Sequence, residues 1–189
     1  MTDSAGAGQG PRLSTRRVYS GRVINVDVDR VRFPNGSEGE LEMVRHSGAS
    51  AVLPFLSDPK GADPQILLIR QFRYAAEQVM YEIPAGRLEP GEAPVVCARR
   101  ELLEETGCTA QQLVPLTTIY TTPGFTDERI HLFMAWDLAL GASQHEPDEF
   151  IENETMQLSR ALAMIEQGQI TDGKTMVALL FAAGFRMGG

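Results

Sequence analysis

The stretch GRLEPGEAPVVCARRELLEETGC, residues 86–108, decides the fold of this chain and gathers eight ionised side chains into 23 residues. Glu101, Glu104 and Glu105 are spaced at i, i+3 and i+4, so a helix brings them to one face. Like charges at this spacing destabilise a helix by a few tenths of a kcal/mol. Their concentration therefore needs a reason, and a bound cation would supply one.

The residues around these carboxylates predict a single helix. It should begin near Pro94, because proline is tolerated in the first turn, and end at Gly107, a residue type that caps helix C-termini. Val95, Ala98 and Leu102 lie roughly opposite the carboxylates. We therefore expect this apolar side to pack on a sheet while the carboxylates face outward.

Strand-like and helical segments fill the rest of the chain. Alternating apolar and polar residues predict a hairpin around PNGSEG, residues 34–39, and short apolar runs predict buried strands. A long acidic loop is expected at 141–153, with a helix after it and a last helix capped by Thr171 or Asp172. The remaining expected strands cover 40–46, 49–56, 65–72, 79–84, 113–122 and 129–138, and a Gly/Pro loop is expected at 85–93. This order indicates an α+β protein or an α/β/α sandwich with a mixed sheet.

Composition places the chain among ordinary one-domain globular proteins. It has 189 residues, 43% hydrophobic content and a net charge of −8, which leaves no basic surface for nucleic acid. No run is long and apolar enough to span a membrane, and the N-terminus does not resemble a signal peptide. Cys97 and Cys108 are too few for a disulfide framework, so reduced thiols and a cytoplasmic location are expected. Residues 1–12 are small, polar and Gly-rich, which predicts a disordered tail.

Carboxylates one helical turn apart can surround a hard divalent cation. Mg²⁺ prefers oxygen ligands and commonly uses carboxylates together with substrate phosphates. Arg100 could hold a neighbouring carboxylate in orientation through a bidentate pair. Taken alone, however, the motif REXXEE also fits a solvated helix face with ordinary i, i+4 pairs.

The upstream residues extend this motif to the spacing Gly86, five residues, Glu92, seven residues, then RELLEETGC. This pattern resembles the signature of the Nudix hydrolases, GX5EX7REUXEEXGU, with Cys108 in the last aliphatic slot as the one departure. The resemblance implies a Nudix fold, an α/β/α sandwich with a mixed sheet. It also implies hydrolysis of a nucleoside diphosphate linked to another group, with Mg²⁺ as the cofactor and Mn²⁺ as the alternative. The implied roles are metal ligands at Glu101, Glu105 and the Ala85 carbonyl, a ligand or water orienter at Glu104, an outer position for Glu92, and loop geometry at Gly86.

Beyond this box, the segments 51–56, 67–92 and 120–135 resemble the ADP-ribose pyrophosphatase branch of the family. Pro123 lies sixteen residues beyond Gly107 and opens PGFTDE, a loop that members cleaving ADP-ribose to AMP and ribose 5-phosphate share. Pro123 and Gly124 are therefore candidate substrate-binding residues. An ordinary Pro-Gly turn is the alternative explanation.

The same resemblance suggests further substrate contacts and a homodimer. Arg73 and Arg45 are candidates to bind a phosphate or the terminal ribose, although each could instead be an ordinary surface ion pair. In this branch the N-terminal β segment, here 13–47, helps to build the partner's adenine pocket, beside a Nudix domain at 48–189. Tyr19 or Phe33 could stack on the base, although either ring could be plain core.

A general base in the resembling enzymes often comes from a mobile acidic loop, which here makes Glu149 the candidate, with Glu146 and Glu152 as rivals. Two alternatives remain open. One is hydrolysis of another nucleotide sugar, such as GDP-mannose. The other is a sensor that binds ADP-ribose without cleaving it, although such regulators usually have a damaged catalytic box or a DNA-binding domain.

Overall fold

The computed structural model describes residues 11–141 and 150–186. These residues form two compact units. The first comprises the described residues up to His46 together with Thr122–Glu128, and the second comprises Ser47–Thr121 and the described residues from Arg129 onward. Each unit has its own sheets and is considered separately.

The first unit is an antiparallel sheet in the order β1-β2-β3, formed by Arg12–Ser20, Asn25–Arg32 and Glu38–Arg45. The predicted hairpin joins β2 to β3, with Gly36 at φ +85° where a left-handed conformation is needed. Segment 122–128 packs on β3 through backbone hydrogen bonds. The Val44 amide donates to the Phe125 carbonyl at 2.7 Å, and the Asp127 amide donates to the Val44 carbonyl at 3.3 Å.

The second unit contains two sheets. One is mixed, in the order β7-β4-β9-β8, with β4 parallel to β9, and the other is antiparallel, in the order β10-β5-β6. The strands are β4 (Ala49–Pro54), β5 (Gln65–Arg73), β6 (Gln78–Glu82), β7 (Ala85–Arg87), β8 (Cys108–Tyr120), β9 (Arg129–Leu140) and β10 (Ile151–Gln157). The helical segments are η1 (Tyr74–Ala76), α1 (Pro94–Thr106), α2 (Leu158–Glu166), α3 (Gly173–Phe181) and η2 (Ala182–Arg186).

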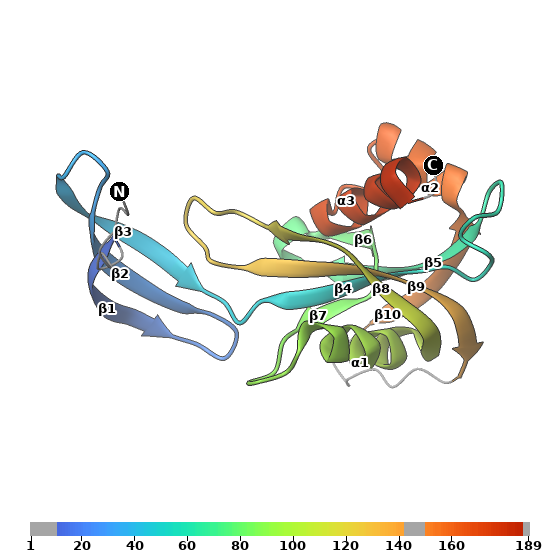
Figure 1. Ribbon diagram of the computed structural model, residues 1–189, viewed down its shortest axis with the longest axis horizontal. Helices are drawn as coiled ribbons and strands as arrows, with labels where there is room; N and C mark the ends of the chain where they lie inside the picture. Colours follow the sequence, from blue (N-terminus) through green and yellow to red (C-terminus); the bar gives the residue numbers. More distant parts are fainter. Residues whose placement is uncertain (1–10, 142–149, 187–189) are drawn as a thin grey trace, which may run out of the picture. The chain divides into compact units, whose positions relative to one another are not determined.

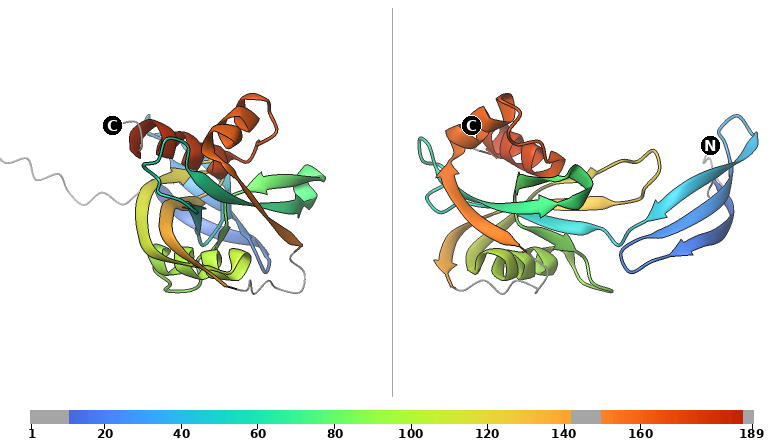
Figure 2. Two further views of the ribbon diagram at one scale, coloured as in Figure 1. Left: turned by 90° about the vertical axis from the view of Figure 1, so that its right-hand side faces the viewer. Right: turned by 180° about the vertical axis from the view of Figure 1, so that it is seen from behind.

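Helices cover both sides of these sheets, with α1 on one side and α2 and α3 on the other (Figures 1 and 2). A larger core joins the strands to α2 and α3, with Phe55, Leu68 and Leu179 among its buried side chains. A smaller core joins them to α1 through residues such as Ala98 and Leu102. This is the predicted α/β/α sandwich with a mixed sheet.

Helix α1 has the bounds that its end signals predict. Pro94 is its first residue, and Gly107 caps its C-terminus at φ 73°, donating its amide to the Leu103 carbonyl. The expected apolar face is only partly correct. Ala98 and Leu102 are buried, whereas Val95 is 42% exposed. The other buried side chains of the helix include Cys97 and two of its glutamates.

Two short strands replace expected loops. Residues 85–87 pair with β4 as β7, and β10 starts at Ile151, inside the expected acidic loop, and pairs with β5. Both are edge strands with few buried side chains, so their sequences carry little strand signal. Among the described helices, none combines the length and hydropathy that crossing a bilayer needs.

Candidate active site

The three glutamates of α1 do not all face outward. Glu101 is 8% exposed and Glu105 is 3% exposed, whereas the Glu104 side chain is 38% exposed. The prediction of an outward-facing carboxylate surface is therefore wrong for two of the three residues. Strand β7, which precedes α1, packs against both of them, and a helical projection of α1 alone contains no information about that strand.

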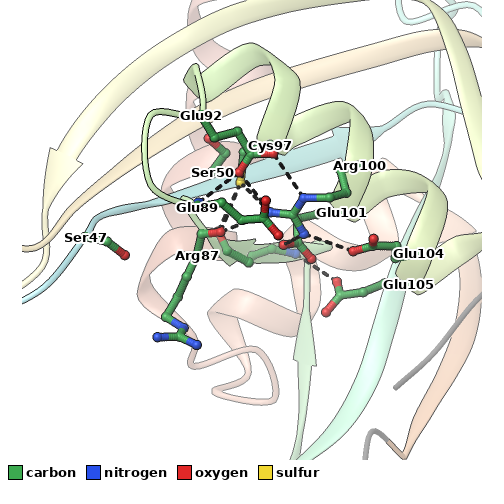
Figure 3. Close-up of polar contacts among 12 residues, drawn as sticks. Ser47, Ser50, Arg87, Glu89, Glu92, Cys97, Arg100, Glu101, Glu104 and Glu105 are labelled. Atoms are coloured by element: carbon green, nitrogen blue, oxygen red, sulfur yellow. Dashed lines mark hydrogen bonds and ion pairs between the residues drawn. The ribbon is translucent and has the colours of Figure 1, made fainter. Parts of the chain in front are cut away.

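Arg100 lies at the centre of the carboxylates (Figure 3). Its Nε and Nη2 each donate to Glu92 at 3.0 Å, and its Nη1 donates to Glu101 at 2.5 Å and to Glu104 at 2.9 Å. Hydrogen bonding to Arg100 holds the pKa of Glu92 below its usual value, and the same bonds raise the pKa of Arg100. Arg100 therefore orients carboxylates, as predicted, and does so for three of them.

Strand β7 fits closely against the buried carboxylates through Ala85 and Gly86. The Ala85 amide donates to Glu105 Oε2 at 2.8 Å. A Cβ added at Gly86 would lie 1.8 Å from Glu101 Oε1, so only glycine leaves room for this carboxylate. The predicted need for glycine at position 86 thus has a direct steric reason, and strand β7 carries both residues.

The Cys97 thiol supports the same strand from α1. It is 3.5 Å from the carbonyl oxygens of Gly86 and Arg87 and can donate to them. Burial, followed by the negative charges of Glu101 and Glu92, raises the pKa of Cys97 to about 11. The thiol therefore stays protonated at neutral pH. Cys97 and Cys108 are both free, as predicted, and both are buried.

The donor set suits a hard divalent cation. Carboxylate oxygens are the ligands that Mg²⁺ prefers. Three carboxylates share the guanidinium of Arg100, and Glu105 accepts from a neutral backbone amide, so negative charge remains in excess beside Gly86. Within residues 11–141 and 150–186, no group of three or more Asp, Glu, His or Cys side chains is arranged so that it could hold a metal ion. The carboxylates are turned toward Arg100 and the Ala85 amide instead.

Arg73, the last residue of β5, forms a forked ion pair with Glu82 of β6. Its Nε is 2.6 Å from Glu82 Oε1, and its Nη2 is 2.8 Å from Oε2. Lys174 of α3 also contacts Glu82 Oε2. Sequence reasoning proposed Arg73 but missed Glu82 and Lys174. An isolated glutamate within the apolar run VMYEI was the signal that could have indicated Glu82.

Arg45, Pro123 and Gly124 lie in the first unit. Arg45 contacts Asp27 at 3.1 Å, Asp127 at 3.2 Å, and Asp29. It thereby ties segment 122–128, which contains Pro123 and Gly124, to strands β2 and β3. Phe33 and Tyr19 lie in this unit too, 36% and 57% exposed.

Of the three general-base candidates, only Glu152 lies within the described residues. Glu146 and Glu149 lie outside the described residues. Glu152 lies in β10, where it pairs with Arg70 at 3.0 Å. Its neighbour Asn153 points to the other side of the strand and donates to the Thr106 carbonyl at the end of α1. Glu152 therefore lies on the strand face away from α1.

Comparisons with known proteins agree with this geometry. The NUDIX domain family matches residues 46–179. The ADP-ribose pyrophosphatase of Bacillus subtilis (strain 168) is 40% identical over 171 residues, spanning 89% of this chain and 90% of its own. The methanol dehydrogenase activator of Bacillus methanolicus has the same identity and the same coverage. Because these two names differ, overall similarity assigns the family more firmly than the substrate.

A solved structure supports the fold. The crystal structure of an ADP compounds hydrolase superposes with a TM-score of 0.78 at 22% identity, covering 94% of each chain. At this identity the likeness concerns the fold alone, and it confirms the predicted fold class.

Proposed function

Because the chain belongs to the Nudix family, we propose that it hydrolyses the pyrophosphate bond of ADP-ribose to yield AMP and ribose 5-phosphate. The observation that carries the proposal is the packing of Glu101 and Glu105 against Ala85 and Gly86 of β7. The 40% identical ADP-ribose pyrophosphatase of Bacillus subtilis supports the choice of substrate. Its similarity extends over 89% of the chain, well beyond the catalytic box.

The cofactor in this proposal is Mg²⁺, with Mn²⁺ as the alternative, held by Glu101, Glu104, Glu105 and the Ala85 carbonyl. When bound, a divalent cation lowers the pKa of water and neutralises charge on phosphate oxygens. Arg100 has a different task. It bridges Glu101 and Glu104 and orients both, since it donates to the two carboxylates through one nitrogen.

The remaining roles follow the chemistry of the substrate. Arg73 offers a guanidinium to the diphosphate, and Glu149 accepts the proton of the attacking water. Arg45 acts on the substrate through the segment that it holds, so that Pro123 and Gly124 line the sugar or phosphate. The net charge of −8 makes these cationic groups important, because an anionic substrate is otherwise repelled.

The protein is proposed to act in the cytoplasm as a homodimer, in which the first unit of one protomer contributes to the site of its partner. The exposed rings of Tyr19 and Phe33 support a stacking role on the adenine. Light scattering coupled to size exclusion measures the mass directly. A value near that of one 20.7 kDa chain at micromolar concentration would contradict the dimer.

A substrate panel tests the function. ADP-ribose, GDP-mannose, NADH and diadenosine polyphosphates are compared by kcat/KM with Mg²⁺ or Mn²⁺, and products are identified by chromatography. We expect ADP-ribose to be preferred by about tenfold or more, a difference of roughly 1.4 kcal/mol. A preference for GDP-mannose would mean that GDP-mannose, and not ADP-ribose, is the substrate. Binding of ADP-ribose without formation of product would favour the alternative of a sensor that binds ADP-ribose without cleaving it.

A further inference from the structure

The first turn of α3 is bonded to the end of β6, immediately before the strand, β7, that packs on the α1 carboxylates. The buried Ile83 amide donates to Thr175 Oγ1 at 2.9 Å. Asp172 caps α3, accepting from the Thr175 amide at 3.0 Å and from its hydroxyl at 2.6 Å. Lys174 of the same turn contacts Glu82 and lies 3.1 Å from Asp172. This turn therefore holds both the backbone and a side chain at the end of β6.

Glu82 is a buried carboxylate held by two cations. It is 2% exposed, and both of its oxygens accept from Arg73, while Oε2 also contacts Lys174. Burial by itself raises the pKa of Glu82, but hydrogen bonds and charge from Arg73 and Lys174 outweigh it and leave the pKa below its usual value. A buried carboxylate with two such partners stays ionised and has little freedom to rotate.

The fork orients Arg73. An arginine side chain has many rotamers, and a planar bidentate pair restricts them. The pair uses Nε and Nη2, so Nη1 is the nitrogen that can reach a further anion. The pKa of Arg73 is raised by Glu82 and, to a smaller degree, by the negative charge of Glu105 on α1. Arg73 therefore lies within electrostatic reach of Glu105, one of the proposed metal-binding carboxylates.

We propose that Lys174 is a positioning residue for substrate binding, which acts by holding Glu82 so that Arg73 presents Nη1 to the diphosphate. This inference rests on the proposed function. The Lys174 side chain is only 10% exposed and its charge is already paired, which excludes a direct contact with substrate as its main role. Without Lys174, Glu82 is paired with one cation instead of two. The ion pair between Glu82 and Arg73 can then move, and Arg73 no longer points at the diphosphate.

Steady-state kinetics with ADP-ribose test the proposal on a matched pair of variants. The sequence has only two lysines, Lys60 and Lys174, and Lys60 lies exposed in the loop between β4 and β5. We expect Lys174→Met to raise KM about tenfold with kcat within about twofold, because ground-state binding is lost rather than chemistry. Lys60→Met should match the wild type, and Lys174→Arg should restore KM to within about threefold. An unchanged KM in Lys174→Met, or a fall in kcat alone, overturns the proposal.

A double variant tests the route through Glu82. If Lys174 acts only by holding this carboxylate, Lys174→Met should add no further rise in KM to Glu82→Gln. An equal rise in both backgrounds would mean that Lys174 acts independently of Glu82, which contradicts the inference.

A measurement on the unmodified protein does not require a Lys174 or Glu82 variant to fold. Carbon-13 and nitrogen-15 labelling of lysine gives two side-chain signals, assigned with Lys60→Met. Titration with ADP-ribose in EDTA should shift the Lys174 signal and leave that of Lys60 in place. Saturable binding by calorimetry with neither signal moving would overturn the proposal. Failure of the proposed function shows separately, as lack of ADP-ribose turnover by the wild type, and the titration then uses whichever panel substrate is cleaved.

Discussion

Two clusters of charged side chains in the second unit use buried glutamate in opposite ways. At α1 and the turn before it, Glu92, Glu101 and Glu104 share the guanidinium of Arg100, and Glu105 accepts from a backbone amide. Between β6 and α3, the single carboxylate of Glu82 is held by Arg73 and Lys174. The first cluster has more carboxylates than cations and so carries excess negative charge. In the second cluster, two cations neutralise the charge of the one carboxylate, Glu82.

This difference separates two tasks. A cluster with too few cations gains by binding a metal ion, since the ion relieves carboxylate repulsion. A cluster in which the carboxylate is already satisfied gains nothing from a metal ion, but it holds an arginine in place for an anionic ligand. The same residue type therefore serves a cation in one cluster and an anion in the other, depending on the partners around it.

The largest expected effect comes from removing a charge from α1. Glu105→Gln keeps the size of the side chain and an oxygen for the Ala85 amide, so it tests charge alone. We expect kcat to fall by on the order of 10³-fold or more, because a metal ligand is lost. Glu166→Gln, at the exposed end of α2, is the control. Wild-type turnover of Glu105→Gln at saturating Mg²⁺ would show that this carboxylate does not hold the metal.

The next effect comes from filling the space beside Glu101. Gly86→Ala would place a methyl group 1.8 Å from one carboxylate oxygen and 2.4 Å from the other. Glu101 must then move, and we expect kcat/KM to fall roughly 10–100-fold and the Mg²⁺ requirement to rise. Gly184→Ala is the control, since its added Cβ has no heavy atom within 4 Å. Equal activity of the two variants would contradict tight packing at Gly86.

Metal binding should stabilise only one of the two clusters. At a Mg²⁺ concentration about 100 times Kd, binding adds about 2.7 kcal/mol of stability, and Tm should rise by roughly 5–10 °C over the value in EDTA. Differential scanning fluorimetry on the wild type, Glu105→Gln and Glu82→Gln measures this rise. We expect Glu105→Gln to lose most of it and Glu82→Gln to keep it. Loss of the shift in both variants would remove the distinction between the clusters.

Signals local in sequence predicted much of the fold. The proline and glycine at the ends of α1 predicted its bounds, because capping depends on residues within one turn. Thr171 and Asp172 were the two predicted candidates for the N-cap of α3, and Asp172 is the one that accepts a hydrogen bond from the Thr175 amide. The α1 carboxylates were recognised because their spacing lies within one helix.

What the sequence did not predict depends on contacts between distant segments. Glu82 and Lys174 are separated by 92 positions, and only the packing of α3 on β6 brings them together. Burial of Glu101 and Glu105 likewise depends on strand β7, whose three residues contain a glycine and no apolar pattern. A helical projection assigns each side of α1 to the sheet or to solvent. It does not include strand β7, which packs on the polar side of the helix.

The smallest expected effect concerns acid stability. The folded-state pKa of Glu82 lies below its usual value of 4.5, because Arg73 and Lys174 stabilise the ionised form more than burial opposes it. A carboxylate with a lowered pKa contributes stability that is fully present above about pH 4.5 and is lost as the pH falls through the folded-state value. Chemical denaturation from pH 7 to pH 3 should therefore show a flatter acid limb for Glu82→Gln than for the wild type, while Glu166→Gln should follow the wild type. Parallel curves for Glu82→Gln and the wild type would mean that the two cations do not stabilise the ionised carboxylate, and the contrast with the α1 cluster would then rest on metal binding alone.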